Sequence, residues 1–86
     1  MVREKLKQNN GKFFLTIKMR FGVSYYQESG VFDVGTPDEE PYLYWTKHKE
    51  YAFGFPTVKR ARAMARKLQQ EHGIRTAIIN RKGMVI

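Results

Sequence analysis

The chain has 86 residues, with sixteen Lys and Arg against eight Asp and Glu, and a formal net charge of +8. A chain of this length has room for a single hydrophobic core, so we expect one domain and exclude a second. Because cysteine is absent, a disulfide scaffold and a thiolate metal site are excluded, and a reducing compartment such as the cytosol is expected.

The first ten residues are polar and charged, and they lead into Asn9-Asn10-Gly11, a turn signal. We expect residues 1–10 to be a mobile lead-in to a single domain. This basic segment is not followed by an apolar run with a small-residue cleavage site, and no apolar run approaches the roughly 20 residues of a membrane span. The sequence therefore predicts a cytoplasmic protein without a membrane partner.

Alternation predicts the first strand. Every second residue from Phe13 to Met19 is apolar, and the residues on the other face are Phe14, Thr16, Lys18 and Arg20. This period-2 pattern is typical of a strand with one buried and one exposed face. A turn at 21–22 and a second strand within 23–34 predict a hairpin, with a bulge or interruption at Ser29-Gly30.

The middle of the chain predicts a loop and a third strand. The segment from Gly35 to Pro41 combines two prolines, a glycine and three acids, which is typical of an exposed loop. Tyr42 to Thr46 is rich in aromatic residues that fit a pleated surface, and we expect a strand there. For Tyr51 to Phe55 two interpretations stay open, a fourth strand or an extended lead into the helix that follows.

The pattern from residue 58 onward predicts an amphipathic helix. Apolar residues recur with spacings of three and four, Thr57 offers a cap, and Gly73 lies where a left-handed residue would end the helix after about 15 residues. Beyond it we expect a strand at 76–79, a turn at 80–83, and an edge strand or docked tail at 84–86. The order β-β-β(-β)-α-β predicts an α+β fold, in which an antiparallel sheet of three to five strands carries one helix on one face.

Catalytic chemistry is not indicated. His48 and His72 lie far apart in the sequence, with neither the HxH nor the HExxH spacing and no carboxylate pair to orient an imidazole. The acidic run Asp38-Glu39-Glu40 lacks the spacing of an EF-hand, and a solvated loop is its expected role. The isolated glycines form no phosphate-cradling motif. We therefore predict a protein that is not an enzyme and has no metal or cofactor.

Positive charge gathers in the last third of the chain, where Glu71 is the one acid. On a helical wheel, Lys59, Arg62 and Arg66 form a stripe beside the apolar arc. Only Glu71 offsets the five positive charges of this helix, so its cations repel one another. A bound anion would relieve this repulsion, and a merely solvated face is the alternative. The predicted contacts with nucleic acid or another anionic partner are Lys59, Arg62, Arg66, Lys67, Arg75, Arg81 and Lys82, with Lys18 and Arg20 on the first strand.

A second predicted contact is aromatic. Aromatic residues make up 14% of the chain, more than so small a core can enclose, so we expect several on the sheet surface. Rings beside Arg and Lys stack on bases in single-strand binders, and the same enrichment marks protein–protein hot spots. The predicted aromatic contacts are Tyr25, Tyr26, Tyr44 and Trp45.

A loose pattern of strand, Trp, turn, Ala, Phe, Thr cap and Ala-rich helix resembles small uncharacterised proteins of phages and mobile elements. The residues of this pattern are Trp45, Ala52, Phe53, Phe55, Thr57, Ala61 and Ala65. The resemblance covers residues 42 to 80 and implies an accessory role, such as inhibiting a host enzyme, countering a defence complex or regulating transcription. The basic hairpin-plus-helix layout is also similar to the arm-binding domains of phage integrases, although those end on the helix and here a strand follows.

The charge and the aromatic content predict a small basic binding protein. The resemblance implies an accessory or regulatory factor of the phage type, acting on nucleic acid or on a nucleic-acid-containing host complex. The alternative is an inhibitor of a host enzyme or defence system, similar to anti-CRISPR proteins, that contacts only protein. A nucleic-acid-binding host protein is therefore a possible partner, and so is a second copy in a homodimer.

Overall fold

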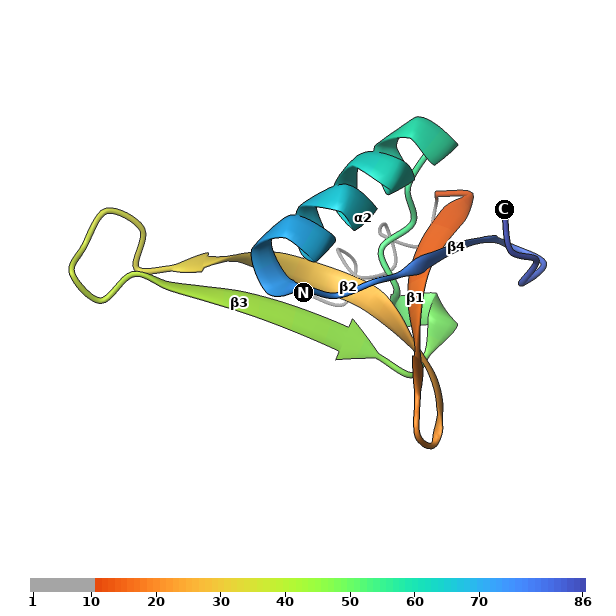
Figure 1. Ribbon diagram of the computed structural model, residues 1–86, viewed down its shortest axis with the longest axis horizontal. Coiled ribbons are helices and arrows are strands. Elements are labelled where there is room, and N and C mark those ends of the chain that lie inside the picture. Colours follow the sequence, from red (N-terminus) through yellow and green to blue (C-terminus); the bar gives the residue numbers. More distant parts are fainter. Residues whose placement is uncertain (1–10) are drawn as a thin grey trace.

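The computed structural model describes residues 11–86, and the predicted lead-in at 1–10 lies outside the described residues. Its strands form one antiparallel sheet in the order β3-β2-β1-β4, and the helix α2 lies across one face (Figure 1). The predicted α+β fold is confirmed. The elements in chain order are β1 (Phe13–Met19), β2 (Gly22–Phe32), β3 (Glu40–Thr46), the 3-10 helix η1 (Lys49–Tyr51), α2 (Val58–His72) and β4 (Ala77–Asn80).

The helix α2 begins and ends where the sequence predicts. The Thr57 hydroxyl accepts a hydrogen bond from the backbone N–H of Arg60 at 3.2 Å, which satisfies one of the free donors of the first turn. At the other end Gly73 adopts the left-handed conformation with φ 68°, which costs glycine no steric strain. Its N–H donates to the carbonyl oxygen of Gln69 at 3.0 Å, and the chain can then turn back toward the sheet.

The sheet is covered on both faces near its centre. On the α2 side, Leu15 and Tyr26 join Ala61 and Leu68 of the helix in the main buried cluster. On the other side, Phe14 is fully buried, in a second cluster that includes Ala52 and Ile79.

The prediction that β1 has one exposed face is therefore wrong at Phe14 and Thr16, which are 0% and 7% exposed. The segment after η1 covers this face, where Ala52 packs with Phe14. The Lys49 Nζ also lies 5.5 Å from the centroid of the Phe14 ring. Period-2 alternation cannot reveal such a cover, because it comes from a segment distant in sequence.

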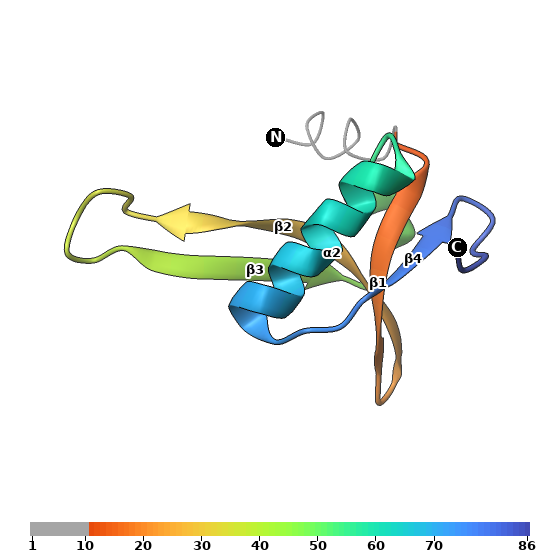
Figure 2. The same ribbon diagram turned by 45° about the horizontal axis from the view of Figure 1, so that its top comes forward.

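The strands β2 and β3 extend past α2 as a two-stranded projection (Figures 1 and 2). We call this projection, residues 28–44, the arm. The ladder runs from Tyr25↔Thr46 to Phe32↔Glu40, with a register shift between Tyr26 and Glu28. The irregularity thus falls at Gln27 and not at the predicted Ser29-Gly30. It turns Ser29 to the same face as Tyr26, and their hydroxyl oxygens lie 2.8 Å apart.

Both interpretations that the sequence left open are decided. Residues 51–55 are the end of η1 and an extended lead into α2, which meets β1 through the single bridge Phe13↔Phe55. The chain end is a docked tail: the Ile86 N–H donates to the carbonyl oxygen of Ile78 at 2.8 Å, and Val85 bridges Ile79. The tail thus lines the outer edge of β4.

Candidate nucleic-acid interface

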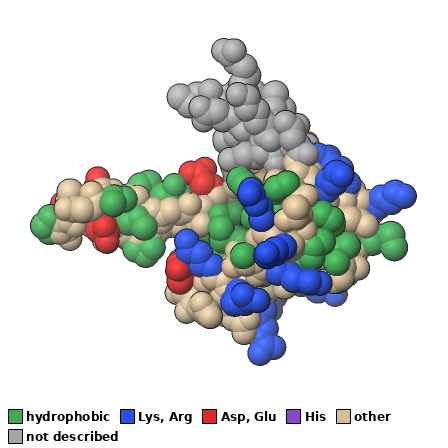
Figure 3. Space-filling model, turned by 90° about the horizontal axis from the view of Figure 1, so that it is seen from above, with side chains coloured by type: hydrophobic (Ala, Val, Ile, Leu, Met, Phe, Trp, Pro, Cys, Tyr) green, Lys and Arg blue, Asp and Glu red, His purple; other side chains and the backbone are tan. Residues whose placement is uncertain are grey.

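Charge is divided between the arm and the rest of the molecule. Residues 24–46 contain no Lys or Arg, and their acids are Glu28, Asp33, Asp38, Glu39 and Glu40. Three of the sixteen Lys and Arg lie within residues 1–10, and the other thirteen all lie in the body formed by residues 11–23 and 47–86. Figure 3 shows the result, with basic side chains over α2 and its surroundings and acidic ones on the arm.

Three arginines surround a hollow beside α2. Arg62, Arg66 and Gln69 recur at i, i+4 and i+7, so they share the flank of the helix that faces β4. Because the chain turns back after Gly73, Arg75 comes to lie beside this flank. The hollow has a volume of about 350 Å³, and we call it the arginine hollow, lined by Arg62, Ala65, Arg66, Gln69, Arg75 and Thr76.

Among residues 11–86, no acid lines the arginine hollow. Glu71, the one acid of residues 56–86, lies on the opposite flank of α2, where it lines another hollow together with Lys67 and His72. Three arginines that line one hollow with no described carboxylate among them concentrate positive charge there, and a bound anion would offset it. Guanidinium forks bind phosphate oxygens in a bidentate manner, so a phosphate is the anion that this geometry suits best.

The residues Arg75 and Thr76 connect this hollow with the other face of the sheet. Both also line a groove of about 570 Å³ that contains Lys18, Val23 and Tyr25. Lys18, a predicted contact, therefore lies on the route that leads from α2 around the β4 edge. Along that route the Thr76 hydroxyl is buried and has no hydrogen-bond partner among the described residues.

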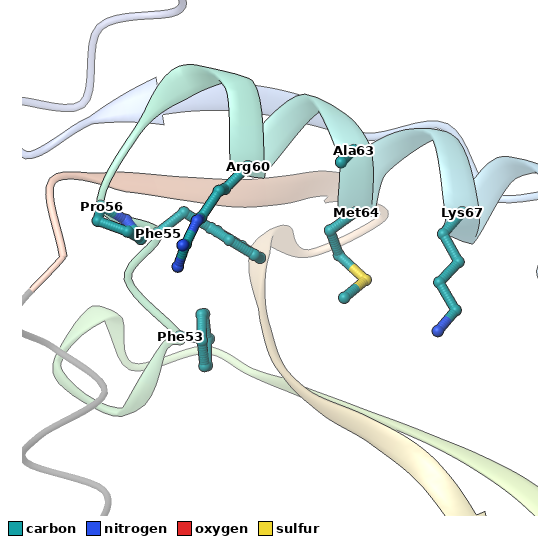
Figure 4. Close-up of a pocket in the computed structure, with 7 residues that line it drawn as sticks. All are labelled: Phe53, Phe55, Pro56, Arg60, Ala63, Met64 and Lys67. Carbon is teal, nitrogen blue, oxygen red and sulfur yellow. The ribbon is translucent and has the colours of Figure 1, made fainter.

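A second hollow, on the other flank of α2, is aromatic. Its volume is about 310 Å³, and its lining is Phe53, Phe55, Pro56, Arg60, Ala63, Met64 and Lys67. Figure 4 shows Arg60, Met64 and Lys67 leaving α2 on the same side, with Arg60 extending toward Phe53. The Phe53 and Phe55 rings lie 4.7 Å apart. We call it the aromatic hollow: an apolar floor with two cations at its rim.

Sequence reasoning missed the aromatic hollow. The signal was present in the aromatic pair Phe53 and Phe55 just before the helix cap, and in Arg60 and Lys67 two turns apart on one flank. Neither observation by itself says that the segment before the cap folds back under that flank.

The four predicted aromatic contacts do not form one surface. Alternation sends Tyr26 and Trp45 to the α2 side, where their rings meet edge to face at 6.1 Å, and sends Tyr25 and Tyr44 to the other side. Tyr26 is 4% exposed, so it cannot offer a ring face, which corrects the prediction. Trp45 packs against the main buried cluster and Tyr25 against the second, while Tyr44 is 48% exposed on the arm.

The remaining predicted basic contacts are scattered. Lys59 and Lys67 are exposed on α2, and Arg20 is exposed in the turn between β1 and β2. Arg81 and Lys82 line a separate hollow near Lys12, and the Arg81 guanidinium lies 5.8 Å from the centroid of the Phe14 ring. The structure thus gathers Arg62, Arg66 and Arg75, and leaves Arg20, Arg81 and Lys82 apart from them.

The comparisons find no match for this chain among protein-family models, curated proteins or solved structures. Across residues 11–86, no helix combines the length and apolar character needed to cross a membrane. Nor do three or more His, Asp or Glu side chains of that segment gather where they could hold a metal ion.

Proposed function

We propose that this protein is a small, non-enzymatic nucleic-acid-binding factor that holds the phosphate backbone in the arginine hollow. The observation that carries the proposal is the meeting of Arg62, Arg66 and Arg75 around one hollow that no acid of the described residues lines. Phosphate contacts of this kind supply most of the affinity of sequence-independent binding. Lys59, exposed on the same helix, adds a further positive charge.

The aromatic hollow supports an unpaired strand as the ligand. An exposed base can enter it and stack on Phe53, while Arg60 and Lys67 at the rim reach the adjoining phosphates. A base within a duplex is already stacked and cannot enter. A strand crossing α2 between its two flanks would meet the arginine hollow on one side and the aromatic hollow on the other.

The biological setting that we propose follows the resemblance to phage and mobile-element proteins. In that setting the protein is a cytoplasmic accessory or regulatory factor that acts on nucleic acid or on a host complex that contains it. The alternative is an inhibitor that contacts only protein and presents the same basic helix to the acidic face of a host enzyme or defence complex.

The experiment is a titration of a fluorescent 20-nucleotide single strand, followed by anisotropy from low to moderate salt. We expect Arg62→Ala/Arg66→Ala to weaken binding by about tenfold or more at low salt, and to reduce the slope of log K against log salt by about 1.4. The matched control is Lys12→Ala/Lys47→Ala, which removes the same charge from exposed positions outside both hollows.

Equal losses of affinity in the two double variants would show that binding depends on net charge and not on the arginine hollow. Absence of binding by the wild-type chain at low salt would overturn the nucleic-acid proposal and leave the inhibitor. Substitution of Phe53 by Ala tests the stacking contact, and we expect it to weaken binding of the single strand while leaving duplex binding unchanged.

A further inference from the structure

The arm carries a row of aromatic rings on the face turned away from α2. Phe32 of β2 and Tyr42 of β3 stack with their ring centroids 4.4 Å apart, and Tyr42 and Tyr44 follow at 5.2 Å. Leu43, between the two tyrosines, points to the other face and packs against the main buried cluster under α2. Phe32 and Tyr44 are 47% and 48% exposed, so the row is accessible to a partner.

The middle ring of this aromatic row is held in place. The Tyr42 hydroxyl donates a hydrogen bond to the Glu28 carboxylate at 2.9 Å. Its ring lies across Gly30 of the neighbouring strand, where a Cβ would meet the hydroxyl oxygen at 2.7 Å. A side chain held on both sides loses little conformational freedom on binding, so the row is organised before a partner arrives.

Carboxylates border the row at both ends. Glu28 pairs with Tyr44 across the strands, and Glu40 pairs with Phe32, so both acids lie on the face of the rings. Asp33, Asp38 and Glu39 follow at the tip, and residues 24–46 contain no cation. This negative potential repels nucleic acid, so the arm's ligand differs from the one proposed for α2.

We propose that the aromatic row of the arm binds an arginine- or lysine-rich segment of a partner protein. Cations bind to the faces of Phe and Tyr rings, and Glu28 and Glu40 are placed to pair with the same side chains. The strand β3 lies at the edge of the sheet, so an extended basic segment can also hydrogen-bond to its free backbone groups. The molecule is thereby a two-ended connector, with an acidic arm for a basic protein and a basic helix for an anion.

The proposal does not depend on the function of α2, because neither the arginine hollow nor the aromatic hollow contains a residue of the aromatic row. Tyr42 and Lys67 do line one further hollow between them. The probe is a fluorescent peptide of nine arginines, titrated with the full chain and followed by anisotropy. We expect Phe32→Ala/Tyr44→Ala to raise Kd by about tenfold or more. Phe21→Ala/Met84→Ala is the control, because it removes two exposed apolar side chains outside the arm, 84% and 61% exposed.

A second pair of variants separates the row from the general charge of the arm. Glu28→Gln/Glu40→Gln removes two charges beside the rings, and Asp33→Asn/Asp38→Asn removes two from the tip. We expect the first pair to weaken peptide binding clearly more than the second, and circular dichroism to show all four variants folded. Equal effects of the two pairs, or a Phe32→Ala/Tyr44→Ala Kd within twofold of wild type, would overturn the proposal.

Sedimentation of the chain alone tests whether the occupant is instead the basic helix of a second copy. We expect a monomer at micromolar concentration and low salt. Oligomers that Phe32→Ala/Tyr44→Ala or Arg62→Ala/Arg66→Ala dissolves would show head-to-tail association and overturn the assignment to a partner protein. Loss of oligonucleotide binding in the α2 variants, with peptide binding unchanged, would support the assignment of the aromatic row to a basic partner protein.

Discussion

The ring of Tyr42 occupies the space that a side chain at Gly30 would need: a Cβ there would lie 2.7 Å from the hydroxyl oxygen and 2.9 Å from Cζ. We expect Gly30→Ala to push this ring aside and break its hydrogen bond to Glu28. The change in unfolding free energy should be about 1 kcal/mol or less, because the displaced atoms are the outer end of a side chain and not backbone. Absorbance titration of the tyrosines in Gly30→Ala measures the loss as a lower Tyr42 pKa. Glu28→Gln is the comparison, and an unchanged Tyr42 pKa in Gly30→Ala would contradict the prediction.

Alkaline pH will destabilise the protein through Tyr26 and Tyr42. Burial raises the pKa of Tyr26, and the hydrogen bond to Glu28 raises the pKa of Tyr42. Above about pH 10 the unfolded chain has already lost these protons while the folded chain still holds them, so stability is full below that pH and falls as pH rises through the folded pKa values. Urea unfolding at pH 8 and above pH 10 measures the fall. We expect the fall in stability to be smaller in Tyr26→Phe. A fall as large as that of the wild type would exclude Tyr26 as a cause.

Removal of the buried Thr76 hydroxyl should not destabilise the protein. Because it has no hydrogen-bond partner among the described residues, we expect Thr76→Val to leave stability unchanged or raise it by about 1 kcal/mol. Thr16→Val is the matched control, since the Thr16 hydroxyl donates to the Ala77 carbonyl oxygen at 3.3 Å, and we expect it to cost about 1 kcal/mol. Chemical denaturation compares the two, and a loss in Thr76→Val as large as in Thr16→Val would mean that this hydroxyl does have a partner.

Gly11, which lies just before β1, packs directly against the backbone of Gly54. A Cβ there would lie 2.0 Å from the carbonyl carbon of Gly54, and backbone atoms cannot swing aside as a side chain can. We expect Gly11→Ala to separate the two segments, weaken the bonds from Lys12 and Phe13 N–H to the Phe55 carbonyl oxygen, and cost about 1–3 kcal/mol. Thermal melting measures the cost. The control is Lys12→Ala, at the exposed neighbouring position, and we expect its melting temperature to be close to that of the wild type. A wild-type melting temperature for Gly11→Ala would refute the prediction.

The sequence by itself determined the elements whose signals are local. The helix α2 follows from 3.6-residue periodicity between Thr57 and Gly73, because its hydrogen bonds and both caps join residues a few positions apart. Alternation likewise located β1. The charge of the arm and of the helix is also a property of the sequence, which is why Arg62 and Arg66 could be singled out before any fold was known.

Only the tertiary structure decided which surfaces these elements share. Burial of Phe14 depends on Ala52, and the arginine hollow depends on Arg75 returning beside Arg62 and Arg66. The prediction that Tyr26 contacts a ligand was wrong for the same reason, because the helix α2, later in the chain, buries its side chain. Contacts between residues distant in sequence carry no period, so composition and spacing cannot reveal them. These contacts decide which residues form the hollows of α2 and which form the aromatic row.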